Sequence, residues 1–175
     1  MIWFTSDTHF AHKKIIEYCD RPFSSVEEMD RAIINNWNSI VGKGDDIYHL
    51  GDFCFGDSSK YTRQLNGCIH LIPGSHDENT VGWCDPVVTI KTPIIDEVSG
   101  RHIRITMCHY AMRSWPLSHY ASWHIYGHHH GKLPPYGLSF DVGVDAWNFS
   151  PISIFEIQRK MKELSPIVDF RKRTR

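Results

Sequence analysis

Three consecutive histidines follow a glycine in residues 124–132, which read HIYGHHHGK. Imidazole nitrogens bind transition metals and transfer protons near neutral pH, so these residues are candidates for a metal site. An affinity tag is disfavoured because tags lie at chain ends, whereas patterned sequence flanks this run on both sides. The alternative is a polar loop rich in histidine, and the choice depends on the partners that the rest of the chain offers.

Four other short segments carry carboxylates or imidazoles that could join such a site. They are Asp7-Thr8-His9, Gly51-Asp52, Gly74-Ser75-His76-Asp77 and His109. Each follows a short apolar run, as the histidine-rich segment does. A single histidine after one strand is more often a core or surface residue, but five such coincidences favour one shared site. A set of imidazole and carboxylate ligands without thiolates suits Mn, Fe, Zn, Ni or Co. It is poorly suited to a structural zinc finger.

The apolar runs that precede these segments are typical of buried strands. We predict strands over residues 2–6, 47–50, 68–73, 102–108 and 123–126, with 86–97 and 102–108 forming a hairpin around Ser99-Gly100. Helices are predicted over 12–19, 25–41 and 58–66. The second helix should begin with a Ser25-x-x-Glu28 capping box. Its predicted apolar stripe consists of Met29, Ile33, Trp37 and Ile40/Val41.

This order of elements predicts an α/β fold, in which the carboxyl ends of neighbouring strands converge on one crevice. The residues that should gather there are Asp7, His9, Asp52, Ser75, His76, His109, His128 and His130. Glycines 51, 74 and 127 suit tight exits from the strands. In an extended turn alternate side chains point the same way, so we expect His128 and His130 to face the site and His129 to face elsewhere.

A length of 175 residues with 41% hydrophobic residues is typical of one globular domain, which we place at 1–164, before a basic tail at 165–175. The net charge of -1 disfavours general attraction to nucleic acid or membranes.

The five cysteines include no Cys-x-x-Cys pair, and Cys54 and Cys108 should be buried, reduced thiols. No secretory signal or membrane-spanning run is visible, which predicts a cytoplasmic protein without a membrane partner. The oligomeric state is left open.

In this order, the five segments resemble the D-x-H, G-D, G-N-H-D, H and G-H-x-H motifs of calcineurin-like metallophosphoesterases. The match spans almost the whole chain, includes its HYAMRSWP and DVGVD segments, and is greatest with the small stand-alone members of bacteria and phages. The resemblance implies a single-domain, four-layer α/β/β/α sandwich with two metal ions at one edge.

Residue by residue, the resemblance implies one ion held by Asp7, His9, Asp52 and His130. The second would be held by Asp52, Ser75, His109 and His128, with Asp52 bridging the two. His76 and Asp52 would be the catalytic residues. His76 would stabilise the transition state or protonate the leaving oxygen. The activity implied is a phosphodiesterase that cleaves a nucleotide or nucleic-acid-derived diester by attack of metal-bound hydroxide, with manganese favoured.

Ser75 departs from the family pattern, which has asparagine there. Its shorter hydroxyl is a poorer ligand than an amide oxygen, so we expect weaker binding of the second ion and slower turnover.

His12 and Arg113 are predicted to contact the substrate, and Asp77 is predicted to be an outer partner of a histidine ligand. Two alternatives stay open: a phosphomonoesterase, and a weakened or inactive protein that binds metal and nucleotide.

Overall fold

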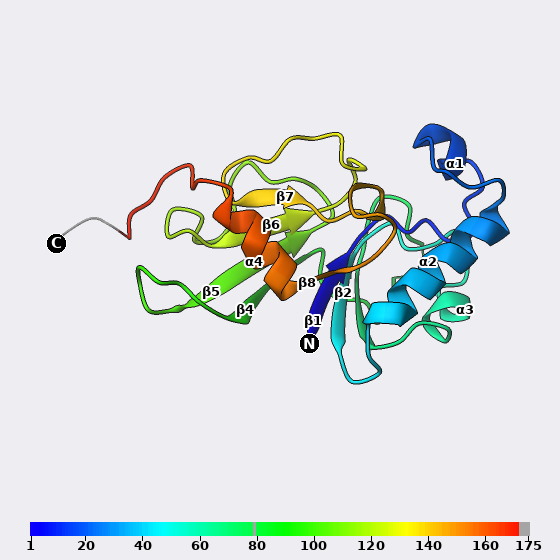
Figure 1. Cartoon of the computed structure of the whole chain (residues 1–175), viewed down its shortest axis with the longest axis horizontal. Helices are drawn as coiled ribbons and strands as arrows, with labels where there is room; N and C mark the ends of the chain where they lie inside the picture. Colours follow the sequence, from blue (N-terminus) through cyan, green and yellow to red (C-terminus); the bar gives the residue numbers. More distant parts are fainter. Residues whose placement is uncertain (79, 172–175) are drawn as a thin grey trace.

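Two four-stranded sheets form the body of the fold in the computed structural model, which describes residues 1–78 and 80–171 (Figure 1). The first sheet has the order β3-β2-β1-β8 and the second β4-β5-β6-β7. The first comprises β1 (Ile2–Thr5), β2 (Asp46–Leu50), β3 (Cys68–Ile72) and β8 (Ile152–Ser153). The second comprises β4 (Val87–Ile95), β5 (His102–Cys108), β6 (Trp123–Tyr126) and β7 (Ser139–Asp141).

Parallel pairing dominates both sheets and sends the ends of several strands to one edge. In the first sheet β1 pairs in parallel with β2, and β2 with β3, while β8 is antiparallel to β1. In the second sheet β5, β6 and β7 are parallel, and β4 is antiparallel to β5. A parallel bridge between Ser6, after β1, and Gly143, after β7, joins the two sheets at this edge.

Four α-helices and one short 3-10 helix complete the described fold. They are α1 (Ile15–Tyr18), α2 (Val26–Ile40), α3 (Ser59–Thr62), η1 (Val144–Ala146) and α4 (Ile154–Lys162). Helix α2 buries the predicted stripe of Met29, Ile33 and Trp37, while Ile40 remains 40% exposed. Its cap is confirmed in part, because the Ser25 hydroxyl accepts from the Glu28 N–H, but the Glu28 carboxylate bonds back to Ser24 and not to Ser25.

Two apolar cores hold these layers together. Helix α2 packs on the first sheet, and its Trp37 belongs to the same buried core as Ile47 of β2 and Leu71 of β3. The second core lies between the sheets, joining Phe4 of β1 to Met107 of β5, and it includes Ile154, Ile157 and Met161 of α4. The predicted α/β sandwich is therefore confirmed.

The short helices differ most from the sequence-based expectation. The helix predicted over 58–66 ends at Thr62, because Gln64 and Leu65 continue as tight turns whose N–H groups bond three residues back. The helix predicted over 12–19 is confined to Ile15–Tyr18. Elements β7, β8 and α4 were not predicted, although Ser153 and Glu156 form a reciprocal capping box at the start of α4.

All five cysteines are free, and Cys54 and Cys108 are buried as predicted. Of the basic tail assigned to 165–175, residues 172–175 lie outside the described residues. Within the described chain, no helix combines the length and the apolar character that a bilayer crossing requires.

Candidate metal centre

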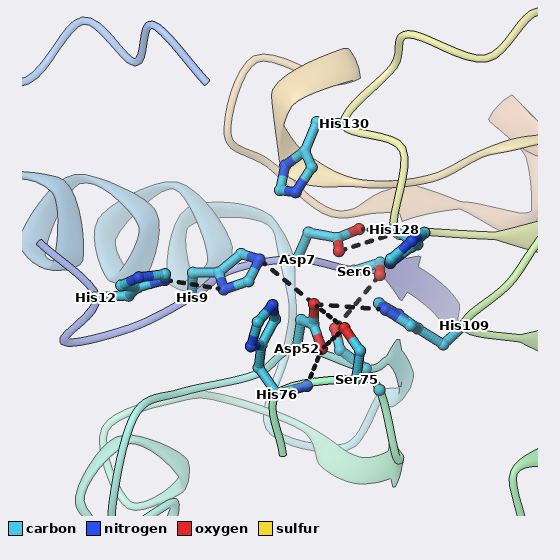
Figure 2. A network of polar contacts seen from close by, with 12 residues as sticks. Ser6, Asp7, His9, His12, Asp52, Ser75, His76, His109, His128 and His130 are labelled. Atoms are coloured by element: carbon cyan, nitrogen blue, oxygen red, sulfur yellow. Dashed lines mark hydrogen bonds and ion pairs between the residues drawn. The ribbon is translucent and has the colours of Figure 1, made fainter. Parts of the chain in front are cut away.

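The first group of metal-binding side chains consists of Asp7, His9 and His130, whose ligand atoms lie within 4.8 Å of one another. Asp7 and His9 follow β1, whereas His130 follows β6 of the other sheet (Figure 2). Asp7 is fully buried and His9 almost so. The junction between the sheets thus brings together ligands that are more than a hundred residues apart in the chain.

The second group consists of Asp52, His109 and His128, again with ligand atoms within 4.8 Å of one another. These residues follow β2, β5 and β6. The Asp52 Oδ2 atom lies 3.6 Å from His9 Nε2 and 3.4 Å from His109 Nε2. One carboxylate oxygen therefore lies between an imidazole of the first group and an imidazole of the second, as Figure 2 shows.

The hydrogen bonding of this cluster fits a metal ion. His9 Nε2 and His109 Nε2 are buried and have no hydrogen-bond partner among the described residues. The opposite ring nitrogen of His109 bonds the carbonyl oxygen of Leu50 at 2.8 Å, which leaves Nε2 directed into the cluster. An unsatisfied buried polar atom costs about 1–3 kcal/mol. A divalent ion would satisfy both nitrogens, and a hydrogen bond to the opposite ring nitrogen is typical of metal-binding histidines.

The buried environment of the cluster shifts the pKa values of its members in different directions. Burial lowers the pKa of His9 to about 2 against the opposing charge of Asp52, so its imidazole is neutral with a free lone pair. Burial raises the pKa of Asp7 to about 7, although His109 and His130 oppose the rise. Burial would also raise the pKa of Asp52, but the adjacent imidazoles of His109 and His9 and the hydrogen bond from the His76 N–H together hold it well below its usual range.

The backbone conformation of the ligands was not predicted. Five candidate ligands adopt left-handed φ angles: Asp7 (56°), His9 (49°), Asp52 (56°), His128 (69°) and His130 (49°). Such angles are uncommon for residues other than glycine, and at about 1–3 kcal/mol each they persist where the surrounding structure enforces them. The prediction of an extended turn at 128–130 was wrong. His128 and His130 both enter the cluster, but they belong to different groups, and the His129 ring lies against Tyr126.

Gly127 allows the histidine-rich turn to approach β1 closely. A Cβ atom at this position would collide with the Ser6 hydroxyl and the Asp7 carboxylate. The N–H of the next residue, His128, is consequently close enough to donate to the Asp7 carboxylate at 3.0 Å. The requirement for glycine here is therefore a close approach, as the sequence suggested.

The loop that follows β3 holds Asp52 in place. The Asp77 carboxylate accepts from the backbone N–H groups of Asp52 and Gly74, at 2.7 and 2.8 Å. The expectation that Asp77 would support a histidine ligand was wrong, because its described hydrogen bonds are to backbone. The Ser75 hydroxyl donates to Asp52 Oδ2 at 3.1 Å, and the His76 N–H donates to Asp52 Oδ1 at 2.8 Å.

Of the predicted substrate contacts, only His12 lies beside the cluster within the described chain, and the predicted catalytic residue His76 lies there too. The exposed His76 ring has its centroid 5.7 Å from that of His9. His12 Nδ1 lies 3.4 Å from His9 Nδ1, and its ring stacks on Phe55. Arg113 has no described contact with the cluster. Its guanidinium carbon lies 5.8 Å from the ring centroid of Tyr136.

Sequence reasoning missed the pair formed by Arg21 and Asp145. The Arg21 guanidinium donates to both carboxylate oxygens of Asp145, each at 2.8 Å, and Asp145 Oδ2 also lies 2.7 Å from His130 Nδ1. Burial lowers the pKa of His130, but the hydrogen bond to Asp145, the contact with Cys19 and the charges of Asp7 and Asp145 together outweigh it and raise that pKa to about 10. The only sequence signal was the position of Asp145 within the DVGVD segment.

Two further groups in the described chain place three potential ligand atoms within 4.8 Å: Cys19 with His130 and Asp145, and Asp46 with Cys68 and His70. The former adjoins the cluster through His130. The latter lies where β2 and β3 begin, at the opposite ends of these strands, and Asp46 and Cys68 are exposed. The Asp52-centred cluster differs from both in its burial and in its unpartnered nitrogens.

No protein-family profile matches the chain. The uncharacterized protein MJ1445 of Methanocaldococcus jannaschii is 36% identical over 165 residues, which cover 87% of this chain and 86% of that protein. The Gene 66 protein of Mycobacterium phage L5 is 27% identical over 83% of this chain and 86% of its own length. Among solved structures, the protein of unknown function AQ665 from Aquifex aeolicus superimposes with a TM-score of 0.69 at 25% identity, covering 91% of this chain and 98% of that one. At this identity and coverage, the chain belongs to the same family as MJ1445 of Methanocaldococcus jannaschii.

Proposed function

We propose that this protein is a dinuclear-metal-dependent phosphodiesterase of the calcineurin-like metallophosphoesterase type. The observation that carries the proposal is the position of Asp52 Oδ2, which lies between the unpartnered Nε2 atoms of His9 and His109. A shared carboxylate between two sets of imidazole and carboxylate ligands is suited to two metal ions. The proposed substrate is a nucleotide or a nucleic-acid-derived phosphodiester.

In this proposal, Asp7, His9, Asp52 and His130 hold one ion, and Asp52, Ser75, His109 and His128 hold the other. The donor set contains nitrogen and oxygen without thiolate, which suits Mn, Fe, Zn, Ni or Co, and we favour manganese. When bound, two such ions lower the pKa of water and neutralise a phosphate group. The carboxylates of Asp7 and Asp52 offset only half of the charge of two divalent ions, so the site would attract an anionic ester.

His76 is the proposed catalytic group that contacts the substrate. Its backbone is tied to Asp52 while its ring is exposed beside His9, so the ring can reach a phosphate without being a ligand. Stabilising or protonating the leaving oxygen by such a group typically contributes roughly 10²–10⁴-fold in rate. His12 would contact the substrate beside His76, because the centroids of these two rings lie 6.3 Å apart.

The proposal is tested by measuring metal content together with hydrolysis of bis(p-nitrophenyl) phosphate and p-nitrophenyl phosphate in manganese. Two ions per chain and faster cleavage of the diester are expected. Faster cleavage of the monoester would favour a phosphomonoesterase instead. A single ion without turnover of either ester would contradict an enzymatic role and favour a protein that binds metal and nucleotide.

Replacing His76 with alanine should reduce diester turnover by roughly 10²-fold or more while leaving two ions bound, because the ring assists the reaction without holding metal. Steady-state kinetics and metal analysis on the same sample measure the two effects. His129→Ala is the matched control, since this neighbouring histidine belongs to neither group of ligands. Loss of metal from His76→Ala would show that its assigned role is wrong.

Replacing Ser75 with asparagine should tighten binding of the second ion and raise turnover. The Ser75 hydroxyl hydrogen already serves Asp52, and the longer side chain of asparagine carries a better oxygen ligand. Manganese titration followed by activity at each metal concentration measures both quantities. Unchanged affinity and rate would remove Ser75 as a cause of weakened activity.

A further inference from the structure

A cavity of about 740 Å³ lies away from the candidate metal centre, on the β4–β5 hairpin. Its walls come from the hairpin, from the loop before β6, and from Arg171 near the end of the described chain. This hairpin lies toward the same end of the molecule as the last described part of the chain, drawn in red (Figure 1). None of the candidate metal ligands lines the cavity, and its volume is in the range of small-molecule sites.

Cationic side chains are concentrated on the hairpin wall. Lys91 of β4 lies directly opposite Arg104 of β5 in the antiparallel register. Directly opposite residues project from the same face of a sheet, and like charges in that position are destabilising. Arg101 adds a third cation to the lining. Among the described residues, no carboxylate forms an ion pair with these three side chains.

The one carboxylate among the described residues that line the cavity already has a partner. Asp96 lines the cavity, but it pairs with Arg171 Nη1 at 2.6 Å and accepts hydrogen bonds from Ser99. His102 Nδ1 bonds the carbonyl oxygen of Thr92, which leaves its Nε2 available for a ligand. The lining therefore keeps an excess of positive charge that a bound anion would balance. Lysine and arginine together are well suited to phosphate.

The part of the lining that comes from the loop before β6 is largely apolar and contains an aromatic ring. Leu117 and Tyr120 are 41% and 53% exposed, respectively, and Ala121 lies beside them. A tyrosine ring can stack on a planar heterocycle, and this interaction does not require a particular base. Phosphate alone would leave this wall uncovered. An anion that carries an aromatic ring would use both walls.

We propose that this cavity binds a nucleoside phosphate, with the phosphate between Lys91 and Arg104 and the base against Tyr120. The site is separate from the proposed catalytic centre. It would let the protein hold a nucleotide, or the nucleotide end of a longer strand, at a distance from the bond that is cleaved.

The test is calorimetric titration of the full-length chain with ADP and with pyrophosphate, each with and without EDTA. Binding that survives EDTA cannot depend on metal at the catalytic centre, so this result does not depend on the proposed activity. The variant Lys91→Met/Arg104→Met should bind ADP at least about tenfold more weakly, because charge-assisted hydrogen bonds to phosphate are lost. Its Tm without ligand should be equal or higher, since the like-charge pair is removed.

The matched control is Lys43→Met/Arg63→Met, which removes two exposed cations outside the cavity and should leave ADP affinity unchanged. If the control variant loses as much ADP affinity, the loss comes from the change in overall charge and not from the cavity, which would overturn the proposal. Absence of ADP binding in EDTA would also overturn it. Equal affinities for ADP and pyrophosphate would contradict the role given to Tyr120.

Discussion

Replacing Asp52 with asparagine is expected to abolish two-metal binding and to lower diester turnover by about 10³-fold or more, since metal ions supply several kcal/mol of transition-state stabilisation. Asp52 is the residue that approaches both groups of ligands. An amide keeps the shape of the carboxylate and can still accept from the His76 N–H at Oδ1. It loses the negative charge and the second equivalent oxygen that a bridging position requires.

Metal analysis and steady-state kinetics measure this loss, and thermal unfolding in EDTA separates it from misfolding. The matched control is Asp46→Asn, at the other end of the same strand, where an exposed carboxylate lies 3.0 Å from His70 Nε2. That change removes the charge of another aspartate beside a histidine and should leave metal content and rate unchanged. Two ions retained in Asp52→Asn at the normal affinity would show that Asp52 does not bridge them.

The positions of the ligands could be predicted because each has a local signal. A buried apolar run followed by a glycine and an acidic residue marks the end of β2 at Asp52, and similar runs precede Asp7 and His109. Parallel pairing then brings such ends to the same edge. The capping box at Ser153 and Glu156 is also local, so α4 could have been predicted from the same kind of signal.

The details that depend on distant contacts could not be predicted. His128 and His130 adopt left-handed φ angles, and Gly127 approaches Ser6 and Asp7 closely. The spacing of the histidines reveals neither feature. Arg21 and Asp145 are 124 residues apart and lie on short, irregular segments without hydrophobic periodicity. A buried ion pair of this kind depends on how the two segments meet, so neither residue was recognised.

Replacing Asp145 with alanine is expected to lower the free energy of unfolding by about 3–5 kcal/mol, because it leaves the Arg21 guanidinium buried without a counter-charge. The Arg21 side chain is 0% exposed and that of Asp145 is 9% exposed. Arg21 also donates to the carbonyl oxygens of Asp7 and Thr8, at 2.7 and 3.0 Å. The pair thus fixes the turn after β1 as well as the 3-10 helix that carries Asp145.

Urea unfolding of three variants separates the sources of this cost. If the unpaired guanidinium is responsible, Arg21→Met/Asp145→Ala should be more stable than Asp145→Ala alone, since the buried charge is gone. Asp169→Ala is the matched control for hydrogen-bond geometry, because the Arg171 guanidinium also donates to both carboxylate oxygens of Asp169, at 2.8 and 2.7 Å. Its cost should be smaller, since Arg171 keeps Asp96 as a partner. Equal costs for the two aspartates would contradict the importance of burial at Asp145.

Metal affinity provides a second readout, which a purely structural role for Asp145 would not change in the same way. Asp145 contacts His130 Nδ1 and so orients the ring whose Nε2 would bind metal. Loss of such an outer partner typically weakens metal binding by about 10–100-fold. The double variant should recover stability but not affinity, because His130 still lacks its acceptor. Recovery of both together would show that Asp145 acts on the metal centre only through the fold, and separate recovery identifies it as the residue that positions His130.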